Sequence, residues 1–426
     1  MWLDKIILLF KIPDLRKKIL FVLGILVIFR IMANIPIPGV DRAELEAFFA
    51  EFEILGLVSV FTGGALETLS VAMLGLGPYI TAVIILQLLT MIFPQLKKIY
   101  QEEGEAGRQK FNQYGRIATV PLAMLQGFGM LTLLQRQGII GEIPPLLMLS
   151  SLLTITAGTL ILMWFGELIT EKGIGNGVSL LIFAGIIAMV PGQVRAMIVG
   201  WDPAMIFTYL AFFVVAFFVI ISVVLINEGR RNIPVSYAKR VRGMKMYGGS
   251  STYLPLNVNP AGVIPIIFAL SILTLPVMLA QFFIGAGGMI ERIAVWVSAF
   301  FGPAGFVFIF SQFLLVFIFT FFYTIVTFDP KSISTNLQKM GGFVPGIRPG
   351  NSTTHYLKYV LYRTLPIGAI FLGLIAIMPS IVAIATRVEV FGFLVGGAAL
   401  LIIVSVVLET MRQIKAQLQM REYETF

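Results

Sequence analysis

The chain has 426 residues, of which 58% are hydrophobic and only 12% charged, and its formal net charge is +9. A soluble globular domain is closer to one quarter charged, so this composition excludes that class and predicts a polytopic membrane protein. The absence of cysteine excludes disulfides and thiolate metal sites, and a single histidine, His355, excludes a histidine cluster for zinc or iron. We therefore expect no metal and no cofactor.

The chain begins MWLDKIILLFKIPDLRKKILFVLG, with no small-residue cleavage site before its first long apolar run. We expect that run to be a retained span and not a signal peptide. Runs of roughly 17–25 apolar residues indicate transmembrane helices, and ten runs are predicted, the fifth of them short. They cover Ile19–Ile35, Leu76–Phe93, Ile117–Leu134, Leu146–Ile169, Val178–Val190, Met205–Ile226, Ala261–Ile284, Phe306–Phe328, Leu365–Ala385 and Val390–Leu408.

An even number of spans places both termini on one side of the membrane, and the basic residues indicate which side. With this span map, 25 of the 31 lysines and arginines fall on the face that carries both termini. The other face holds Arg30, Arg42, Arg136, Arg195, Arg292 and Arg387. By the positive-inside rule, the first face is cytoplasmic.

Between the first two spans lies a short apolar segment, Ala65–Leu74, with Gly63 and Gly64 before it and Gly75, Gly77 and Pro78 after it. It is too short to cross a membrane, and glycines at each end favour a re-entrant half-helix. Such backbone is tolerated at membrane depth only where it is buried in protein or lines a cavity. The alternative is an interfacial helix lying flat on the outer leaflet.

Leu76, Ile80 and Ile84 recur every four residues on one face of the second span. An apolar stripe of this kind ordinarily packs against other helices. It is also suited to a hydrophobic constriction that closes a pore by dewetting, and periodicity does not separate the two interpretations.

Two loops on the basic face are long, near residues 227–258 and 329–360. Long ordered loops in compact proteins are usually functional, and a basic surface suits an RNA-rich or acidic partner. The second loop contains FVPGIRPG, Phe343–Gly350, in which prolines and glycines bracket Arg348. Taken alone, this stretch is typical of a surface turn with an incidental charge.

Enzymatic chemistry is not expected. GIGNG at Gly173–Gly177 lacks the Lys-Ser/Thr of a phosphate-binding loop and is interpreted as a tight turn. Glu167 and Glu409 lie at the ends of spans, so the chain lacks the mid-membrane carboxylate pairs of a proton-coupled carrier. No Ser/His/Asp or paired-aspartate arrangement falls within the predicted spans.

Six motifs occur in order along the chain: ANIPIPGVD, GPYITAVIILQLL, EGEAGRQKFNQYGR, GELITEKGIGNGVSLLIFAGII, LPLNVNPAGVIPIIFA and GGFVPGIRPG. Together they resemble the bacterial SecY family, the central subunit of the Sec protein-conducting channel (preprotein translocase). The resemblance covers essentially the whole chain. It implies an all-α membrane protein in two inverted halves, residues 1–200 (spans 1–5) and 201–426 (spans 6–10), related by a pseudo-two-fold axis around a central pore.

The resemblance also assigns the pore lining. A ring of six apolar residues would act as a gasket at the waist of the pore. Its members here would be Leu76, Ile80, Ile182, Ile186, Ile267 and Val407. A re-entrant plug helix near residues 61–74 would close the pore. The plug residues would be Ala65, Leu66, Glu67, Thr68, Leu69, Ser70, Val71, Ala72 and Met73.

The family's lateral gate, which opens sideways to lipid, would carry Thr81, Gln126 and Asn259. Without the resemblance, these residues would be interpreted as ordinary interhelical hydrogen-bonding groups. Arg348 matches the tip of the loop by which family members engage the ribosome or the motor ATPase SecA. A rigid turn presents its guanidinium to a carboxylate or phosphate. The other partner-binding loop would contribute Arg240, Arg242 and Lys245.

The expected function is a passive channel that passes unfolded secretory polypeptides across the bacterial inner membrane and releases transmembrane segments into lipid. The implied partners are SecE, SecG, SecA, the ribosome with its RNA, signal sequences, nascent polypeptides and membrane lipids. A secondary transporter with inverted repeats is the alternative, and it predicts a midplane polar site. An intramembrane enzyme is a third class, disfavoured because catalytic groups are missing.

Overall fold

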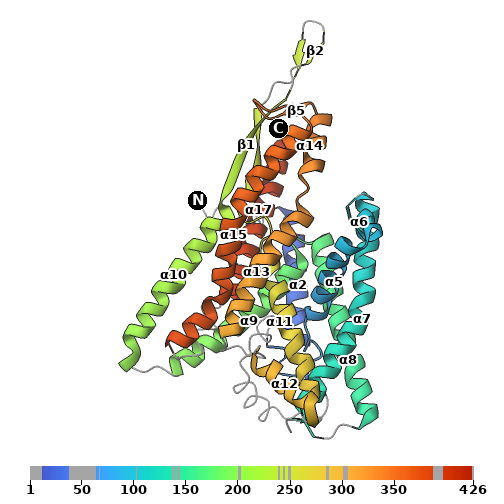
Figure 1. Ribbon diagram of the computed structural model, residues 1–426, viewed down its shortest axis with the longest axis vertical. Helices are drawn as coiled ribbons and strands as arrows, with labels where there is room; N and C mark the ends of the chain where they lie inside the picture. Colours follow the sequence, from blue (N-terminus) through green and yellow to red (C-terminus); the bar gives the residue numbers. More distant parts are fainter. Residues whose placement is uncertain are drawn as a thin grey trace.

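The computed structural model describes residues 12–37, 64–66, 68–101, 103–136, 140–141, 144–199, 203–237, 240–242, 245–247, 251–284, 287–300, 306–386 and 397–424. They form an elongated helical bundle with small β-sheets at one end (Figure 1). The first helices are α2 (Pro13–Met32), α5 (Gly77–Ile92), α6 (Pro94–Gln101), α7 (Gly104–Arg136), α8 (Pro145–Lys172) and α9 (Gly177–Val199). The later ones are η1 (Pro203–Met205), α10 (Ile206–Glu228), α11 (Ile264–Phe283), α12 (Gly288–Phe300), α13 (Phe306–Thr327), α14 (Pro330–Lys339), α15 (Asn351–Thr386) and α17 (Gly397–Glu424).

Proline and glycine decide where several helices begin. Pro13, Pro78, Pro145 and Pro265 occupy the first or second position of α2, α5, α8 and α11. The missing N–H of proline costs nothing there, because the first amides of a helix have no partner within the helix. The start of α9 follows the turn at Gly173–Gly177, where Gly175 has a φ of +92° that favours glycine.

Each of the ten predicted spans coincides with a helix: α2, α5, α7, α8, α9, α10, α11, α13, α15 and α17. Six of the described helices are long and apolar enough to cross a membrane, or seven if α5 and α6, bent by 115°, count as one span. The number of crossings therefore stays a prediction. The fifth span is longer than expected, because α9 continues through Pro191 to Val199. Proline is tolerated inside helices at membrane depth when neighbouring groups satisfy the backbone.

The sequence did not predict the β-sheets, which form where two long loops were expected. Strands β1 (Arg230–Tyr237) and β4 (Ser251–Asn257) pair antiparallel, with Arg230 opposite Asn257 and Ser236 opposite Ser251. The short strand β5 (Gly342–Phe343) pairs with the far end of β1. Side chains alternate across β1, so Ile233 and Val235 are both 1% exposed. A second hairpin of β2 (Arg240–Arg242) and β3 (Lys245–Tyr247) extends beyond the sheet (Figure 1).

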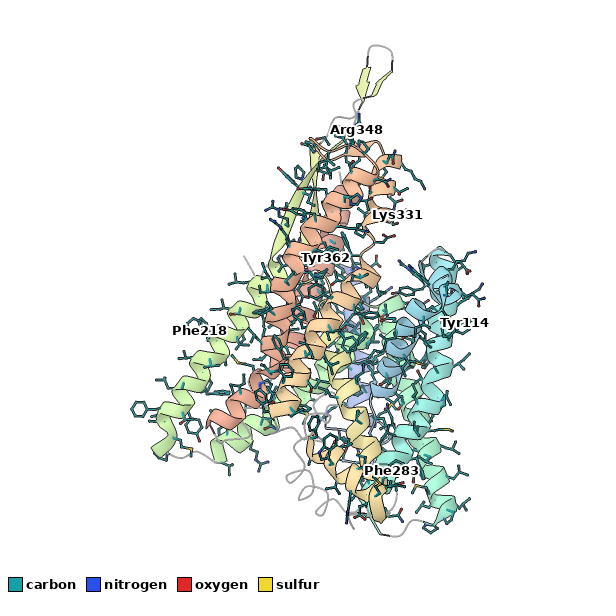
Figure 2. The ribbon with its side chains drawn as sticks, in the orientation of Figure 1. Tyr114, Phe218, Phe283, Lys331, Arg348 and Tyr362 are labelled. Carbon is teal, nitrogen blue, oxygen red and sulfur yellow. The ribbon has the colours of Figure 1, made fainter. Side chains whose placement is uncertain are left out.

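The sheet brings the two long loops into one structure, which we call the platform: β1, β4, β5, α14 and the turn at residues 344–350. A separate apolar cluster stabilises it, including the buried side chains of Ile233, Leu256, Val344 and Leu357. Figure 2 shows Arg348 and Lys331 on this end of the molecule and Phe283 at the opposite end. We call the first the basic end.

The uneven distribution of lysine and arginine predicts how the molecule is oriented. A reporter domain fused after Lys245 should be active in the cytoplasm, because β3 lies at the basic end (Figure 1). A reporter fused near Arg136, at the end of α7, should be exported. Paired enzyme reporters that are active on one side only provide the measurement. An exported reporter after Lys245 would contradict the orientation.

Candidate functional site

The centre of the bundle holds an apolar cluster that we call the waist. Leu76, Ile182 and Ile186 belong to it and are 5%, 4% and 2% exposed. Ile80 on α5 and Ile267 on α11 pack against the same cluster and are partly buried. The structure therefore brings five of the six predicted ring residues into one apolar cluster, from helices on both sides of the bundle.

The sixth predicted residue, Val407, is not part of the waist. Its side chain is 44% exposed on α17, whereas the preceding Val406 is 4% exposed and belongs to the cluster. Sequence does not fix the register of this helix, because α17 carries an unbroken apolar run in which periodicity does not mark the buried face.

One hydrogen bond indicates which part of α17 is level with the waist. The N–H of Gly175, just before α9, donates to Oε1 of Gln413 on α17 at 2.7 Å. Helices α9 and α17 pack side by side, and both extend from this bond in the same direction. Each advances about 1.5 Å per residue, so equal numbers of residues counted from Gly175 and from Gln413 reach the same level. Ile182 and Ile186 lie 7 and 11 residues beyond Gly175, level with positions 406 and 402. Ile402 is 1% exposed and belongs to the same cluster.

The predicted plug segment is buried but is not a helix. Its described residues, 64–66 and 68–76, form consecutive turns, and Leu69 adopts a φ of +39°. The N–H of Ile37 donates to the carbonyl of Leu69 at 2.9 Å, and the N–H of Val71 donates to the carbonyl of Ile35 at 3.0 Å. At Ser70 the segment forms an isolated antiparallel bridge with Pro36, because the chain after α2 supplies a pairing partner. Glu67 and residues 61–63 lie outside the described residues.

The side chains of this segment are among the most deeply buried in the molecule. Leu69 and Met73 are 0% exposed and Leu66 is 1% exposed, packed in a cluster with residues of α7 and α8. Ala65 and Ala72 belong instead to the central cluster that contains the waist. The segment thus lies between the waist and the α7–α8 pair, with its small residues toward the waist cluster.

Gly158 on α8 makes this arrangement possible. A Cβ atom at Gly158 would lie 2.0 Å from the carbonyl oxygen of Val71, closer than any real contact. The absence of a side chain lets the backbone of the segment lie directly on α8. Glycine is required here for close approach, since its backbone is ordinary helix.

The three predicted gate residues lie near one seam but are not bonded to one another. Helix α11 packs against both α5 and α7. Thr81 is 5% exposed and donates through Oγ1 to the Gly77 carbonyl of its own helix at 2.9 Å. Gln126 is half-buried on α7. Asn259 is 6% exposed and donates through Nδ2 to Oδ1 of Asn227 at 3.2 Å.

The predicted loop residue Arg348 is exposed at the top of the platform (Figure 2). The turn that carries it is tightly held, since Oγ1 of Thr353 donates to the Arg348 carbonyl at 2.9 Å and Oγ of Ser334 donates to the Gly350 carbonyl at 2.7 Å. Gly346 and Gly350 have φ values of +81° and +98°, which only glycine adopts easily. Arg240, Arg242 and Lys245 lie on the β2–β3 hairpin.

Two ion pairs at these helices were not predicted. Arg116 on α7 donates through Nε to Glu167 on α8 at 2.7 Å. Arg412 on α17 donates through Nη2 to Glu228 at the end of α10 at 2.6 Å. The two residues of each pair lie 51 and 184 positions apart in the chain, so no local sequence pattern reveals either ion pair. Among the described residues, no group of three His, Asp or Glu side chains is arranged to hold a metal ion.

Fold and site together define a polytopic helical membrane protein whose helices pack around a central apolar cluster. The chain matches the family model described as SecY over residues 70–411. It is 43% identical over 432 residues to a Streptomyces scabiei protein named Protein translocase subunit SecY, with 98% of both chains covered. A Mycobacterium bovis protein of the same name is 42% identical over 434 residues, with 97% of both covered.

Solved structures share the fold. "The structure of a protein conducting channel" superposes with a TM-score of 0.64 at 19% identity, covering 93% of this chain and 91% of that chain. "Sec61 in the Canine ribosome-channel complex from the endoplasmic reticulum" gives a TM-score of 0.59 at 20% identity over the same shares. The chain belongs to the SecY family of protein translocase subunits.

Proposed function

We propose that this protein is a protein-conducting channel: it passes unfolded secretory polypeptides across a membrane and releases transmembrane segments sideways into lipid. The apolar waist carries the proposal. Branched apolar side chains from α5, α9, α11 and α17 meet there, and a constriction of this kind holds no ion, excludes a thin thread of water and adapts to any side chain that passes.

The burial of polar groups argues against the secondary transporter. Such a carrier places charged or titratable groups near the midplane. In the part of the chain that the structure describes, the buried polar side chains are those of serine, threonine, asparagine and glutamine, with no charged residue among them.

We assign the pore ring to Leu76, Ile80, Ile182, Ile186, Ile267 and Ile402, with Ile402 in place of Val407. Residues 65–73 serve as the plug, and the seat of this segment against Gly158 supports that role. The lateral gate lies where α11 meets α5 and α7, and it carries Thr81, Gln126 and Asn259. The two halves of the channel, residues 1–200 and 201–426, move apart along this seam.

The partners follow from the platform and from the relatives. A rigid basic turn at Arg348 and the basic β2–β3 hairpin suit the acidic surface of the motor ATPase SecA or the RNA of a ribosome. Sec61 in a ribosome-channel complex shares the fold, which supports ribosome binding. SecE and SecG complete the channel, and exposed apolar faces such as that of α10 are available to them and to lipid. The basic end faces the cytoplasm of a bacterial inner membrane, with both termini.

The pore ring is tested by a matched pair of substitutions on one helix. Ile402→Asn places an amide in the waist, so ions should pass the resting channel, whereas Val407→Asn changes an exposed position and should not. Planar-bilayer conductance of the resting channel is the measurement. A leak through Val407→Asn with a tight Ile402→Asn channel would restore the sequence-based register.

The function itself is tested by reconstitution. The wild-type protein, placed in vesicles with SecE, SecG and SecA, should import an unfolded preprotein when ATP is added, and should do so without import of small solutes. Protease protection of the preprotein is the measurement. Solute uptake without protein import would favour the transporter.

A further inference from the structure

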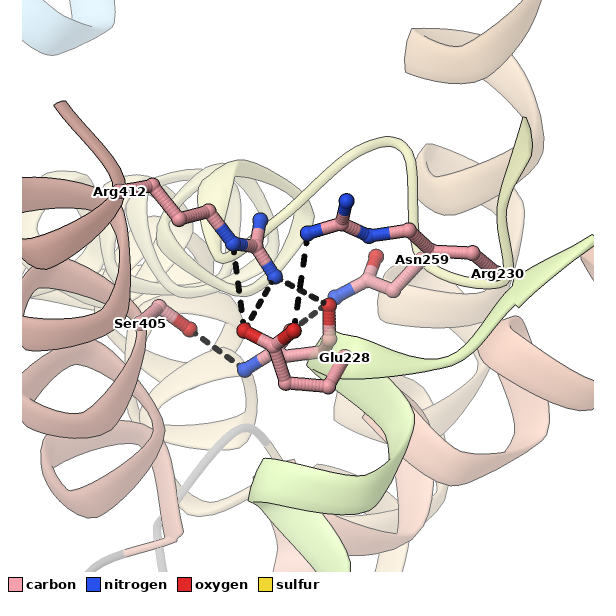
Figure 3. Close-up of polar contacts among 6 residues, drawn as sticks. Glu228, Arg230, Asn259, Ser405 and Arg412 are labelled. Carbon is pink, nitrogen blue, oxygen red and sulfur yellow. Dashed lines mark hydrogen bonds and ion pairs between the residues drawn. The ribbon is translucent and has the colours of Figure 1, made fainter. Parts of the chain in front are cut away.

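Six residues form a polar cluster where the platform joins the helices (Figure 3). They are Asn227, Glu228, Arg230, Asn259, Ser405 and Arg412. Apart from Asn259, a proposed gate residue, the channel function described above assigns its members no role. Ser405 on α17 directly precedes Val406 of the waist cluster. It ties together the end of α10, the start of β1, the chain before α11, and α17.

Asn227 is the centre of the cluster. Its Nδ2 donates to Oγ of Ser405 at 2.8 Å, and its Oδ1 accepts from Nδ2 of Asn259 at 3.2 Å. Its carbonyl accepts from Nη2 of Arg412 at 3.0 Å. Both ends of one amide and its own backbone are therefore engaged, and the three bonds lead to two other parts of the chain, α17 and the residues before α11.

The next residue anchors the root of the platform. Glu228 accepts from Nε and Nη2 of Arg412 at 3.2 and 2.6 Å, and Arg230 lies 3.5 Å from its other oxygen (Figure 3). The β1–β4 ladder leaves at Gly229 and returns at Val258, where the N–H of Val258 donates to the Gly229 carbonyl at 2.9 Å. Asn259 follows directly, five residues before α11 begins.

The ladder therefore works as a stiff arm with its root at this cluster. Seven residue pairs join β1 and β4 without interruption, so a force on the platform reaches Gly229 and Val258 with little bending. The root itself rests on α15: a Cβ atom at Gly368 would lie 2.6 Å from the Val258 carbonyl oxygen. The backbone at Val258 therefore lies directly on the backbone of α15, and the arm can tilt about this contact.

The hold on Asn259 is incomplete. Its Nδ2 donates to Asn227 and, at 3.1 Å, to the carbonyl of Gly262, but its Oδ1 is buried with no hydrogen-bond partner. A buried acceptor without a partner destabilises the arrangement that contains it. The closed arrangement at the start of α11 therefore depends strongly on the side-chain hydrogen bond that Asn259 donates to Asn227.

We propose that Asn227 is a positioning residue that couples the platform to the lateral gate. A partner that tilts the β1–β4 arm withdraws Asn227 from Asn259, and α11 is then free to move away from α5 and α7. The Arg412–Glu228 pair sets the resting position of the arm. This inference rests on the proposed function, because it takes the seam at α11 to be the gate.

The test measures the width of the seam directly. The chain has no cysteine, so spin labels attach only at introduced cysteines, at Leu125 on α7 and Leu279 on α11, both exposed. Distances between them are measured in membranes by pulsed electron paramagnetic resonance, with and without purified bacterial ribosomes. The wild-type seam should be narrow at rest and wider with ribosomes.

Asn227→Ala removes the bond to Asn259 and should raise the wide-seam population at rest roughly three- to tenfold, the factor that corresponds to one hydrogen bond. Ribosomes should then widen the seam little further. Asn227→Asp keeps an oxygen that accepts from Asn259 and should behave like the wild type. Arg412→Ala, which loosens the same arm from α17, should shift the resting seam in the same direction as Asn227→Ala.

The control is Arg116→Ala, which breaks an ion pair of similar geometry, between α7 and α8, away from the platform root. It should leave the resting seam narrow. Resting distances equal to the wild type in both Asn227→Ala and Arg412→Ala would overturn the coupling, and so would equal widening by Asn227→Asp and Asn227→Ala. Ribosomes that fail to widen the wild-type seam would instead contradict the proposed partner, whatever the resting distances show.

Discussion

Gly158→Val is expected to displace the plug and make the resting channel leak ions. The carbonyl oxygen of Val71 would lie 2.0 Å from the new Cβ atom, and backbone does not rotate out of the way as a side chain does. Overpacking a tight contact costs about 1–3 kcal/mol. The protein avoids this cost when the plug segment leaves its position against α8. Conductance of the resting channel in planar bilayers measures the result.

The matched control is Gly192→Val. Gly192 lies on α9, and nothing would lie within 4 Å of a Cβ atom at that position. This variant should remain tight, so a leak in both would point to a general effect of valine in a membrane helix. A tight Gly158→Val channel that folds and inserts normally would contradict the assignment of residues 65–73 as the plug.

Arg348→Glu is expected to abolish SecA-driven import while folding, insertion and resting conductance stay normal. The side chain is exposed on a turn held by Ser334 and Thr353, so no stability depends on its charge. In the engaged complex, charge reversal replaces a charge-assisted contact with repulsion and should cost roughly 2–5 kcal/mol. Import of a preprotein into vesicles, as a function of SecA concentration, measures the loss.

Two further variants show whether the geometry or only the charge matters. Arg348→Lys keeps the charge but loses the two-pronged guanidinium, so import should be intermediate. Lys331→Glu makes the same reversal at another exposed position of the platform, on α14, and should change import little. If Arg348→Glu imports normally, the loop is a turn with an incidental charge.

The sequence predicted most of the helices because each is a long apolar run, and the membrane leaves such runs few alternatives. It predicted the basic end because lysine and arginine concentrate in particular loops. It missed the β-sheets because the paired strands are far apart in the chain. Strand β4 pairs with β1 but lies beyond the β2–β3 hairpin, and β5, which also pairs with β1, comes about a hundred residues later. Pairing over such separations has no local signature.

The errors at the site have the same origin. The plug segment was expected to be a helix because it is short, apolar and flanked by glycine, yet its described residues form turns that bond to Ile35 and Ile37. Val407 was assigned to the pore from the family resemblance, in an apolar run without a distinctive motif, and its neighbour Val406 is the residue that belongs to the central cluster. The polar cluster around Asn227 joins residues up to 185 positions apart.

The way residues 64–76 are folded has a consequence for how fast the channel opens. The described residues do not form a rigid helix that swings on a hinge: their own bonds are single turns. Two backbone bonds, and a side-chain bond from Thr68 to the Ala33 carbonyl, tie the segment to the chain after α2. Its departure from this position is therefore a local unfolding event. The barrier is then governed by the apolar side chains of Leu66, Leu69 and Met73 leaving their cluster. Smaller residues at these three positions would shorten the lifetime of the closed state while leaving the width of the open pore unchanged.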